Sequence, residues 1–256
     1  GAGPAGIRAA QRLVAAGLHP VVVDEGARAG GQIYRRPPEG FTRPPQTLYG
    51  SEADKALDLH RCFDRMLDAG QLSYHPRSSV VALGAQGAQV LGPDGVDTLA
   101  YDKLILATGA TDRLAPVPGW QSAGVYSLGA TQIALKSQGV ALGRRMVLAG
   151  SGPLLTLVAS QLRKAGAQVV AVLDTAPLTT QAAGVIGMAL ARPRVTLRGA
   201  VMRAGLGRSY HAGVTLTRIA TDTTGPTQVH WQDAHGRDHA TSCDMVGLGW
   251  HLRAET

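Results

Sequence analysis

The sequence predicts an α/β fold, because a glycine turn, a helix and a β-branched strand follow one another twice along its 256 residues. The first of these units begins at Gly1 and the second at Gly150. In both units the strand leads into an acidic residue. A repeat of this length indicates duplicated domains rather than a solenoid. We therefore expect two Rossmann-like dinucleotide-binding domains, the second inserted in the first, with small antiparallel β elements.

The first glycine turn has the pattern Gly1-x-Gly3-x-x-Gly6, with Pro4 and Ala5 among its members. Gly1 permits a tight turn, Gly3 lets a pyrophosphate approach the backbone, and Gly6 lets the helix pack closely on its strand. The helix that begins here would direct free N–H groups and the positive end of its dipole at the phosphates. The turn therefore predicts a pyrophosphate site.

The helix after this turn ends at Gly17, a residue typical of a C-terminal cap, and the next strand covers residues 20–23. Asp24 and Glu25 come directly after that strand. A carboxylate at this distance from the turn accepts hydrogen bonds from the ribose hydroxyls of a bound dinucleotide. The residues alone leave open which of the two acids does so.

The segment between the two units supplies the rest of the first domain. A loop rich in glycine and proline comes first, and a helix over 52–68 follows it. A strand over 103–107 then runs into another glycine turn. Proline and glycine at 116–119 favour a boundary there, so we expect a first domain over 1–115 and a second over 116–256. Further strands are expected near 72–74, 79–83 and 88–91.

The second unit has an apolar strand, residues 145–149, directly before its glycine turn. A Rossmann domain needs such a strand, whereas the first unit begins at the turn itself. We therefore expect the first domain to be incomplete, without its first strand and its C-terminal part. After the second unit we expect a helix around 180–190 and strands near 214–219, 227–231 and 245–248, which alternate as half-exposed antiparallel strands do.

The turn of the second unit contains Gly150, Gly152 and Pro153, but Leu155 replaces its third glycine. This replacement prevents the closest approach of helix to strand and changes the geometry of a pyrophosphate site. Asp174 ends the next strand, and no arginine follows it to receive a 2′-phosphate, so NAD(H) is favoured over NADP(H). The sequence also allows that this domain binds another adenine nucleotide, or nothing.

Composition argues against several other classes. The net charge of +7 comes from scattered lysines and arginines, and only 4% of residues are aromatic, so we expect no nucleic-acid partner. The longest apolar stretches are strand-sized, which predicts no membrane span, and no secretory signal opens the chain. Cys62 and Cys243 form no CxxC pair and the histidines form no ligand cluster, so we expect no metal site. Such cysteine usage fits a cytoplasmic location.

Three motifs together carry a family resemblance: the turn GAGPAG with its acids, the sequence GGQ at 30–32, and the sequence ATG at 107–109. This combination resembles the FAD/NAD-linked pyridine nucleotide oxidoreductase superfamily. Within it, residues 30–38, 104–113 and 116–120 are similar to the flavoprotein α subunits of opine oxidases, hydrogen cyanide synthase and bacterial proline or hydroxyproline dehydrogenases. The related part of heterotetrameric sarcosine oxidase is similar as well.

The resemblance implies that FAD binds the first domain and that NAD is a possible ligand of the second. The residues that it assigns to FAD are Gly1, Gly3, Pro4, Ala5 and Gly6 at the pyrophosphate, Asp24 or Glu25 at the ribose, Gly31 and Gln32 near the ribityl chain and flavin, the backbone of Val80 near the adenine, and Ala107, Thr108 and Gly109 where the chain closes over the FAD. Those assigned to NAD are Gly150, Gly152, Pro153 and Asp174.

The resemblance also implies an activity, that of the electron-transferring flavoprotein subunit of a complex. A second, amino-acid-oxidase-like subunit would oxidise an amino acid, imino acid or opine. We assign no side chain of this chain as catalytic. The alternatives are a self-contained NADH-dependent flavin reductase and a nonenzymatic nucleotide-binding regulatory module. An iron–sulfur cluster, which the resembling proteins bind further towards the C-terminus, stays undecided.

Overall fold

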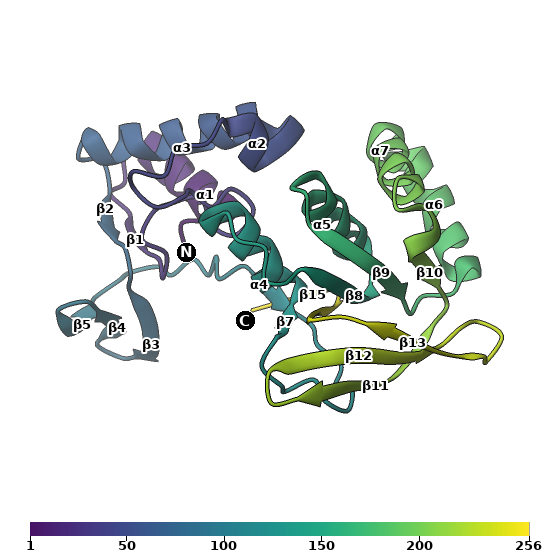
Figure 1. Ribbon diagram of the computed structural model, residues 1–256. Coiled ribbons are helices and arrows are strands. Elements are labelled where there is room, and N and C mark those ends of the chain that lie inside the picture. The colour runs from purple at the N-terminus through teal and green to yellow at the C-terminus, as the bar shows by residue number, and fades with distance from the viewer. Residues whose placement is uncertain (256) are drawn as a thin grey trace. The chain divides into compact units, whose positions relative to one another are not determined.

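The computed structural model describes residues 1–255, which form two compact units. The first unit comprises Gly1–Ala110 together with residues 254 and 255, and the second comprises Thr111–Arg253. The second unit is therefore inserted in the sequence of the first. The chain leaves the first unit along β6 (Ala110–Asp112) and returns along β15 (Leu252–Ala254), and these two strands pair with each other (Figure 1).

The first unit is built around two helices, α1 (Pro4–Ala15) and α3 (Ala53–Asp68), which pack beside each other. Proline is favoured in the first turn of a helix, and Gly17 follows α1 at a φ of +77°, which other residues rarely adopt. The helix predicted over 52–68 is confirmed. The shorter elements of this unit are β1 (Val21–Val23), α2 (Pro45–Tyr49), the 3₁₀ turn η1 (Gly50–Glu52) and β2 (Ser73–His75). Strand β2 is parallel to β1. The core of the unit contains Ile7, Ala10, Val22, Leu59, Phe63 and Met66.

A three-stranded antiparallel sheet of β3 (Ser79–Gly84), β4 (Gly87–Gly92) and β5 (Gly95–Leu99) also belongs to the first unit. We predicted the first two strands and missed β5, which contains glycine and aspartate, residues that are depleted in strands. The strand predicted over 103–107 is not formed in the structure. No described strand pairs with this stretch, and its apolar residues 104–106 are exposed.

The second unit is built on a five-stranded parallel sheet, which confirms the α/β prediction. Its strands, in spatial order, are β10 (Tyr210–Ala212), β9 (Gln168–Asp174), β8 (Arg145–Ser151), β14 (Met245–Trp250) and β7 (Val125–Ser127).

Both faces of this sheet are covered (Figure 1). On one face α5 (Pro153–Lys164) and α4 (Leu128–Ile133) bury an aliphatic core against the strands. On the other face lies an antiparallel sheet of β11 (Thr215–Asp222), β12 (Gly225–Gln232) and β13 (Asp238–Ser242). The remaining elements are η2 (Ala134–Gln138), a π-helical turn, α6 (Leu178–Ala191), α7 (Pro193–Ala204) and η3 (Gly207–Ser209).

The strand predicted near 245–248 is formed, but its half-exposed, antiparallel character was predicted wrongly. We expected a half-exposed antiparallel strand, but β14 lies inside the parallel sheet between β8 and β7, and Met245, Val246 and Leu248 are buried. The apparent alternation comes from glycine rather than from polar residues. A Cβ at Gly247 would lie 2.7 Å from the side chain of Leu148, so this glycine allows close packing instead of facing water.

The helix predicted around 180–190 is confirmed as α6, whereas α7 was missed. Arg192 has φ −146° and ψ 70°, which breaks the helix, and Pro193 begins the next one at its first position. None of the helices in residues 1–255 is long and apolar enough to cross a membrane.

Candidate dinucleotide-binding sites

The first glycine turn is too tightly packed for side chains at two of its positions. A Cβ at Gly6 would lie 1.8 Å from the carbonyl oxygen of Gly1. A Cβ at Gly1 would lie 2.3 Å from the carbonyl oxygen of Ala107. The turn, the start of α1 and the segment that contains Ala107 therefore meet through their backbones, as the sequence pattern requires.

Gly3 differs, because it leaves room for a Cβ. A Cβ there would have one near neighbour, the Cα of Gly31 at 3.7 Å. Gly3 is the N-cap of α1 and no side chain caps the helix, while Pro4 has no N–H to satisfy. The first-turn N–H groups, those of Ala5 and Gly6 among them, and the positive end of the helix dipole are therefore left to a phosphate rather than to a side-chain cap. The residues present fit the pyrophosphate of a dinucleotide.

The Gly30-Gly31 pair lies directly against this turn. The N–H of Gly30 donates to the carbonyl oxygen of Ala2 at 2.8 Å. Gly31 has φ +62°, and a Cβ on it would lie 2.6 Å from the Cα of Gly3. The structure thus brings together two motifs that the sequence separates by almost thirty residues. Gln32 is exposed, and its side-chain oxygen accepts from Arg35 at 3.0 Å.

The segment after this glycine pair is anchored to α3, a feature that sequence reasoning missed. The Nε2 of the buried His60 donates to the carbonyl oxygen of Tyr34 at 2.8 Å. The guanidinium of Arg36 donates to both carboxylate oxygens of Asp64, at 3.0 and 2.9 Å. Burial lowers the pKa of His60, so the ring is neutral near pH 7. The only sequence signal was the polar residues on the inner face of a predicted helix.

Asp24 holds the first turn in place. One of its carboxylate oxygens accepts from the backbone N–H of Ala2, and the other accepts from the N–H of Gly26 at 2.7 Å. Glu25, the other acid that the sequence left open, is exposed. The neighbouring Tyr74 on β2 has a buried hydroxyl without a hydrogen-bond partner among the described residues, and burial, with the charge of Asp24, raises its pKa to about 12.

The segment 107–109 meets the returning end of the chain. The hydroxyl of Thr108 donates to the carbonyl oxygen of Glu255, and the N–H of Glu255 donates to the carbonyl oxygen of Gly109 at 3.1 Å. Gly109 has φ +85°. This segment therefore lies against the first turn on one side and pairs with the chain end on the other. Val80 does not lie with these segments. It lies on β3 and is 45% exposed.

The second turn is built differently. A Cβ at Gly150 would lie 1.7 Å from the carbonyl oxygen of Gly249, so the close approach is between two strands. Gly152 is the N-cap of α5, again without a side-chain cap and with Pro153 next. Leu155, in place of a third glycine, is fully buried in the core under α5.

A histidine lies at the second turn, although no sequence pattern indicated it. A Cβ at Gly152 would lie 2.7 Å from the Nδ1 of His251, so the imidazole ring lies over the start of α5. His251 has φ +64°, an unusual backbone conformation for a residue with a Cβ. The imidazole therefore occupies the space beside Gly152.

Asp174, the acid of the second unit, is only 4% exposed. One carboxylate oxygen accepts from the N–H of Ala176 at 2.9 Å, and the other accepts from the hydroxyl of Tyr210 at 2.5 Å. Burial and this hydrogen bond raise the pKa of Tyr210. The guanidinium of Arg203 lies 4.5 Å from the centre of the tyrosine ring. Asp174 is therefore already engaged by the protein on both of its oxygens.

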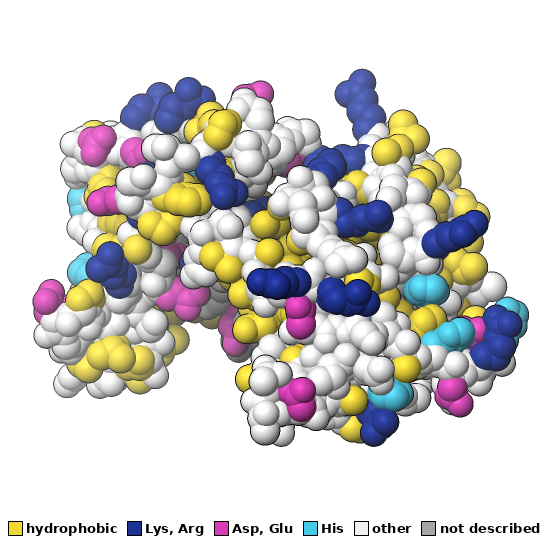
Figure 2. Space-filling model, viewed as in Figure 1, with side chains coloured by type: hydrophobic (Ala, Val, Ile, Leu, Met, Phe, Trp, Pro, Cys, Tyr) yellow, Lys and Arg dark blue, Asp and Glu magenta, His cyan; other side chains and the backbone are white. Residues whose placement is uncertain are grey.

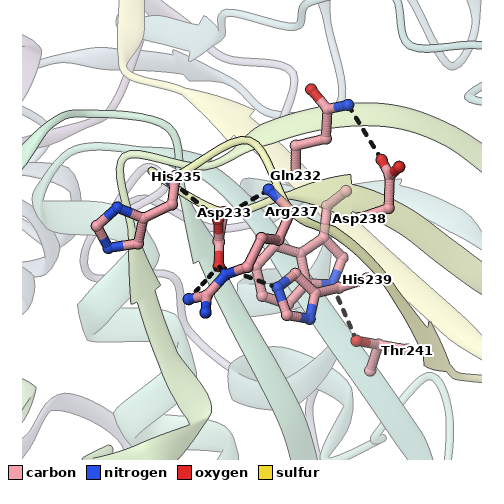
Figure 3. Close-up of polar contacts among 8 residues, drawn as sticks. Gln232, Asp233, His235, Arg237, Asp238, His239 and Thr241 are labelled. Atoms are coloured by element: carbon pink, nitrogen blue, oxygen red, sulfur yellow. Dashed lines mark hydrogen bonds and ion pairs between the residues drawn. The ribbon is translucent and has the colours of Figure 1, made fainter.

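A further polar cluster surrounds Asp233 in the turn between β12 and β13 (Figure 3). Its carboxylate accepts from the backbone N–H groups of His235 and Arg237, at 2.9 and 3.0 Å, and lies 3.2 Å from the Nε2 of His239. The His239 ring stacks on Trp231 at 4.4 Å. These contacts stabilise a hairpin turn. In residues 1–255 no group of three or more metal-ligating side chains lies together.

Comparisons with known proteins place the chain in a family. The family model of the pyridine nucleotide-disulphide oxidoreductases matches residues 1–199. One subunit of opine oxidase from Rhizobium meliloti is 43% identical over 189 residues, which cover 70% of this chain and 35% of that protein. Hydrogen cyanide synthase subunit HcnB from Pseudomonas protegens is 31% identical over 266 residues, which cover 98% of this chain and 55% of that protein.

A solved structure shares the fold. L-proline dehydrogenase from P. horikoshii matches with a TM-score of 0.63 at 16% identity, over 99% of this chain and 41% of that chain. The chain spans about a third to a little over half of the length of these relatives. The family match confirms the resemblance that the glycine turns indicated. The chain belongs to the pyridine nucleotide-disulphide oxidoreductase family.

Proposed function

We propose that this chain is part of a FAD-dependent oxidoreductase and that FAD binds at the start of α1. The observation that supports this most is the convergence of three glycine-containing segments, 1–6, 30–31 and 107–109, at an uncapped helix N-terminus. Bound FAD would supply the redox chemistry, by accepting two electrons from a reduced substrate and passing them on.

In this proposal the protein's own groups position the cofactor. The first-turn N–H groups of α1 donate to the pyrophosphate beside Gly3. Asp24 holds the turn through Ala2, and the exposed Glu25 accepts from the ribose hydroxyls. Gly31 and Gln32 lie along the ribityl chain and flavin.

We also propose that the whole protein is the flavoprotein subunit of a complex that oxidises an amino acid, an imino acid or an opine. Two relatives are named as subunits, one of opine oxidase and one of hydrogen cyanide synthase. A second, amino-acid-oxidase-like subunit would carry the substrate site, because no described side chain at the first turn is placed as an acid, base or nucleophile.

The test is the flavin content of the full-length protein, measured by absorbance after denaturation. We expect one FAD per chain. A valine side chain at position 3 fills the phosphate space, so Gly3→Val should lower the FAD content at least tenfold. Gly84→Val is the matched control, because a Cβ at Gly84 has no neighbour closer than 3.9 Å. Full FAD content in a folded Gly3→Val protein would contradict the proposal.

A second candidate function, NADH-dependent flavin reduction, is favoured by the uncapped turn at the start of α5. Here Gly150, Gly152 and Pro153 would hold the pyrophosphate of NAD(H), and Asp174, in addition to its bonds from Ala176 and Tyr210, would accept a further hydrogen bond from the ribose. Asp174→Ala should then weaken NADH binding by about 1–2 kcal/mol, the scale of a hydrogen bond to a charged group, and NADPH binding much less. Calorimetric titration of both nucleotides measures this. Binding of ADP but of neither nicotinamide nucleotide would make this site regulatory.

A further inference from the structure

The register of the parallel sheet places one side chain at the second glycine turn. Strand β14 pairs with β8 so that Trp250 lies opposite Ser151. The residue after β14, His251, therefore lies beside the residue after β8, Gly152. A Cβ at Gly152 would lie 2.7 Å from the Nδ1 and 2.8 Å from the Cε1 of the His251 ring. The imidazole is therefore in contact with the backbone at the start of α5.

This contact lies at the end of the sheet where open α/β sheets bind their ligands. The chain leaves β8 through α5 and continues to β9 on one side, whereas β14 lies on the other side of β8. Ligands of such sheets bind beyond the carboxyl ends of the strands, at the point where the strand order changes direction. His251 directly follows the carboxyl end of β14 at this point.

The two glycine turns differ in what lies beside their second glycine. A Cβ at Gly3 would have the Cα of Gly31 as its nearest neighbour, at 3.7 Å, whereas the space beside Gly152 is filled by the imidazole. The second glycine of such a turn lets a pyrophosphate approach the backbone, because a side chain there would obstruct it. The ring of His251 lies where such a side chain would be. It therefore obstructs a pyrophosphate in the same way.

The backbone of His251 is held in place, whereas its ring is not. The N–H of Arg113 donates to the carbonyl oxygen of His251 at 3.0 Å, and His251 has φ +64°. The side chain is exposed, and no hydrogen bond or ion pair of its ring is formed within residues 1–255. Exposed side chains change rotamer within nanoseconds. Rotation about the Cα–Cβ bond can therefore move the ring away from Gly152 without a change in the backbone.

We propose that His251 gates the second turn. Its imidazole excludes the pyrophosphate of an adenine nucleotide, and the nucleotide binds only after the ring has rotated away. This inference rests on the second candidate function, which supplies the nucleotide, and it adds a regulation of that site. The measured affinity is then the affinity of the open turn, reduced by the fraction of molecules in which the ring has moved.

The test is calorimetric titration of the full-length, FAD-containing protein with NADH and, separately, with ADP, which also contains a pyrophosphate. His251→Gly removes the ring, and glycine adopts a φ of +64° readily. This variant should bind the nucleotide at least tenfold more tightly than the unchanged protein. His251→Phe keeps a ring beside Gly152 and should keep the weak binding. Circular dichroism checks that both variants are folded.

The matched control removes an imidazole elsewhere in the second unit. Histidine side chains gather over the antiparallel sheet of this unit (Figure 2). His235 is exposed in the hairpin turn between β12 and β13. His235→Gly is the same substitution away from the second turn, and it should leave the affinity for both nucleotides unchanged.

Four results would overturn the gate. Equal affinity in His251→Gly would show that the ring does not obstruct the nucleotide, and lower affinity would show that the imidazole holds it instead. Tight binding by His251→Phe would show that a ring does not close the turn. Binding of neither nucleotide by any variant would leave the turn without a ligand to exclude.

The two nucleotides separate this inference from the proposed function. A tenfold gain for ADP without any binding of NADH would support the gate and contradict NAD(H) as the ligand of the second unit. The FAD content is measured on the same samples by absorbance after denaturation. Failure of the FAD proposal is therefore seen independently of the gate.

Discussion

The two glycine turns of this chain share the pattern Gly-x-Gly-Pro but are held together by different contacts. In the first, Asp24 accepts a hydrogen bond from Ala2, so the acid after the strand fixes the turn. In the second, Asp174 accepts from the hydroxyl of Tyr210, on the neighbouring strand β10. Here the close backbone contact is between Gly150 and the carbonyl oxygen of Gly249. Both acids use their remaining oxygen alike, for a backbone N–H two residues further on.

This difference shows where each turn can tolerate change. In the first turn Gly1 and Gly6 pack against backbone, so a side chain at either position has no room, whereas a Cβ at Gly3 would only touch the Cα of Gly31. The second has exchanged its third glycine for Leu155 and relies on core packing. A buried leucine stabilises the fold, whereas a glycine contributes close approach. The first turn therefore contributes close backbone packing, as the proposed FAD site requires, whereas the second contributes a buried side chain to the core of its unit.

The largest effect is expected when the first turn receives the third residue of the second turn. Gly6→Leu gives the first turn the residue of the second, and its Cβ would overlap the carbonyl of Gly1. We expect complete loss of FAD and displacement of α1, measured by flavin absorbance and circular dichroism. Gly184→Leu, on an exposed face of α6 with no neighbour within 4 Å of a Cβ, is the control. Retained FAD in the Gly6→Leu variant would mean that this turn adapts as the second one has.

Truncating the leucine tests the stabilising role of the second turn. Leu155→Ala removes a fully buried side chain and leaves a cavity, so the free energy of unfolding should fall by about 3 kcal/mol. Leu190→Ala, at a side chain that is 84% exposed, should change it by less than about 0.5 kcal/mol. Denaturant titration measures both. Equal effects would show that α5 does not depend on this contact.

Tyr210 beside Asp174 and Tyr74 near Asp24 allow the hydrogen bonding of the two acids to be compared directly. Tyr210→Phe removes a hydrogen bond to a buried carboxylate and should destabilise the protein by about 2 kcal/mol. Tyr74→Phe removes a buried hydroxyl for which the described residues offer no partner, so stability should stay the same or rise by about 1 kcal/mol. Denaturant titration again measures both. A loss of stability in Tyr74→Phe would reveal a partner for that hydroxyl.

The smallest effect is a dependence on alkaline pH. The pKa values of Tyr74 and Tyr210 are raised, chiefly by burial, to about 12 for Tyr74. Unfolded tyrosine ionises near pH 10, so above that pH the folded protein holds protons that the unfolded chain releases. Stability should therefore be constant below pH 10 from this source and decline above it. Tyr210→Phe should make the decline less steep, and an unchanged slope would contradict the assignment.

Much of this architecture follows from local pattern, and the errors have physical causes. The glycine turns, Gly17 and the acids predicted two helix–strand units. Glycine marks the tight turn before each helix and the end of the helix, and the acid marks the end of the strand. β14 was misread because glycine can imitate a polar position in an alternating strand. The anchoring of residues 34–36 by α3, and the imidazole over Gly152, were missed because they join segments far apart in the sequence. No local pattern reports such contacts.

The pairing of β6 with β15 has a consequence for synthesis of the protein. The bonds that join Thr108 and Gly109 to Glu255 can form only after residues 111–253 have left the ribosome. The inserted unit is one continuous stretch, whereas the unit around it is split. The nascent chain can therefore complete the insert first, and segment 107–109 stays without these bonds until residues 254 and 255 have emerged as well.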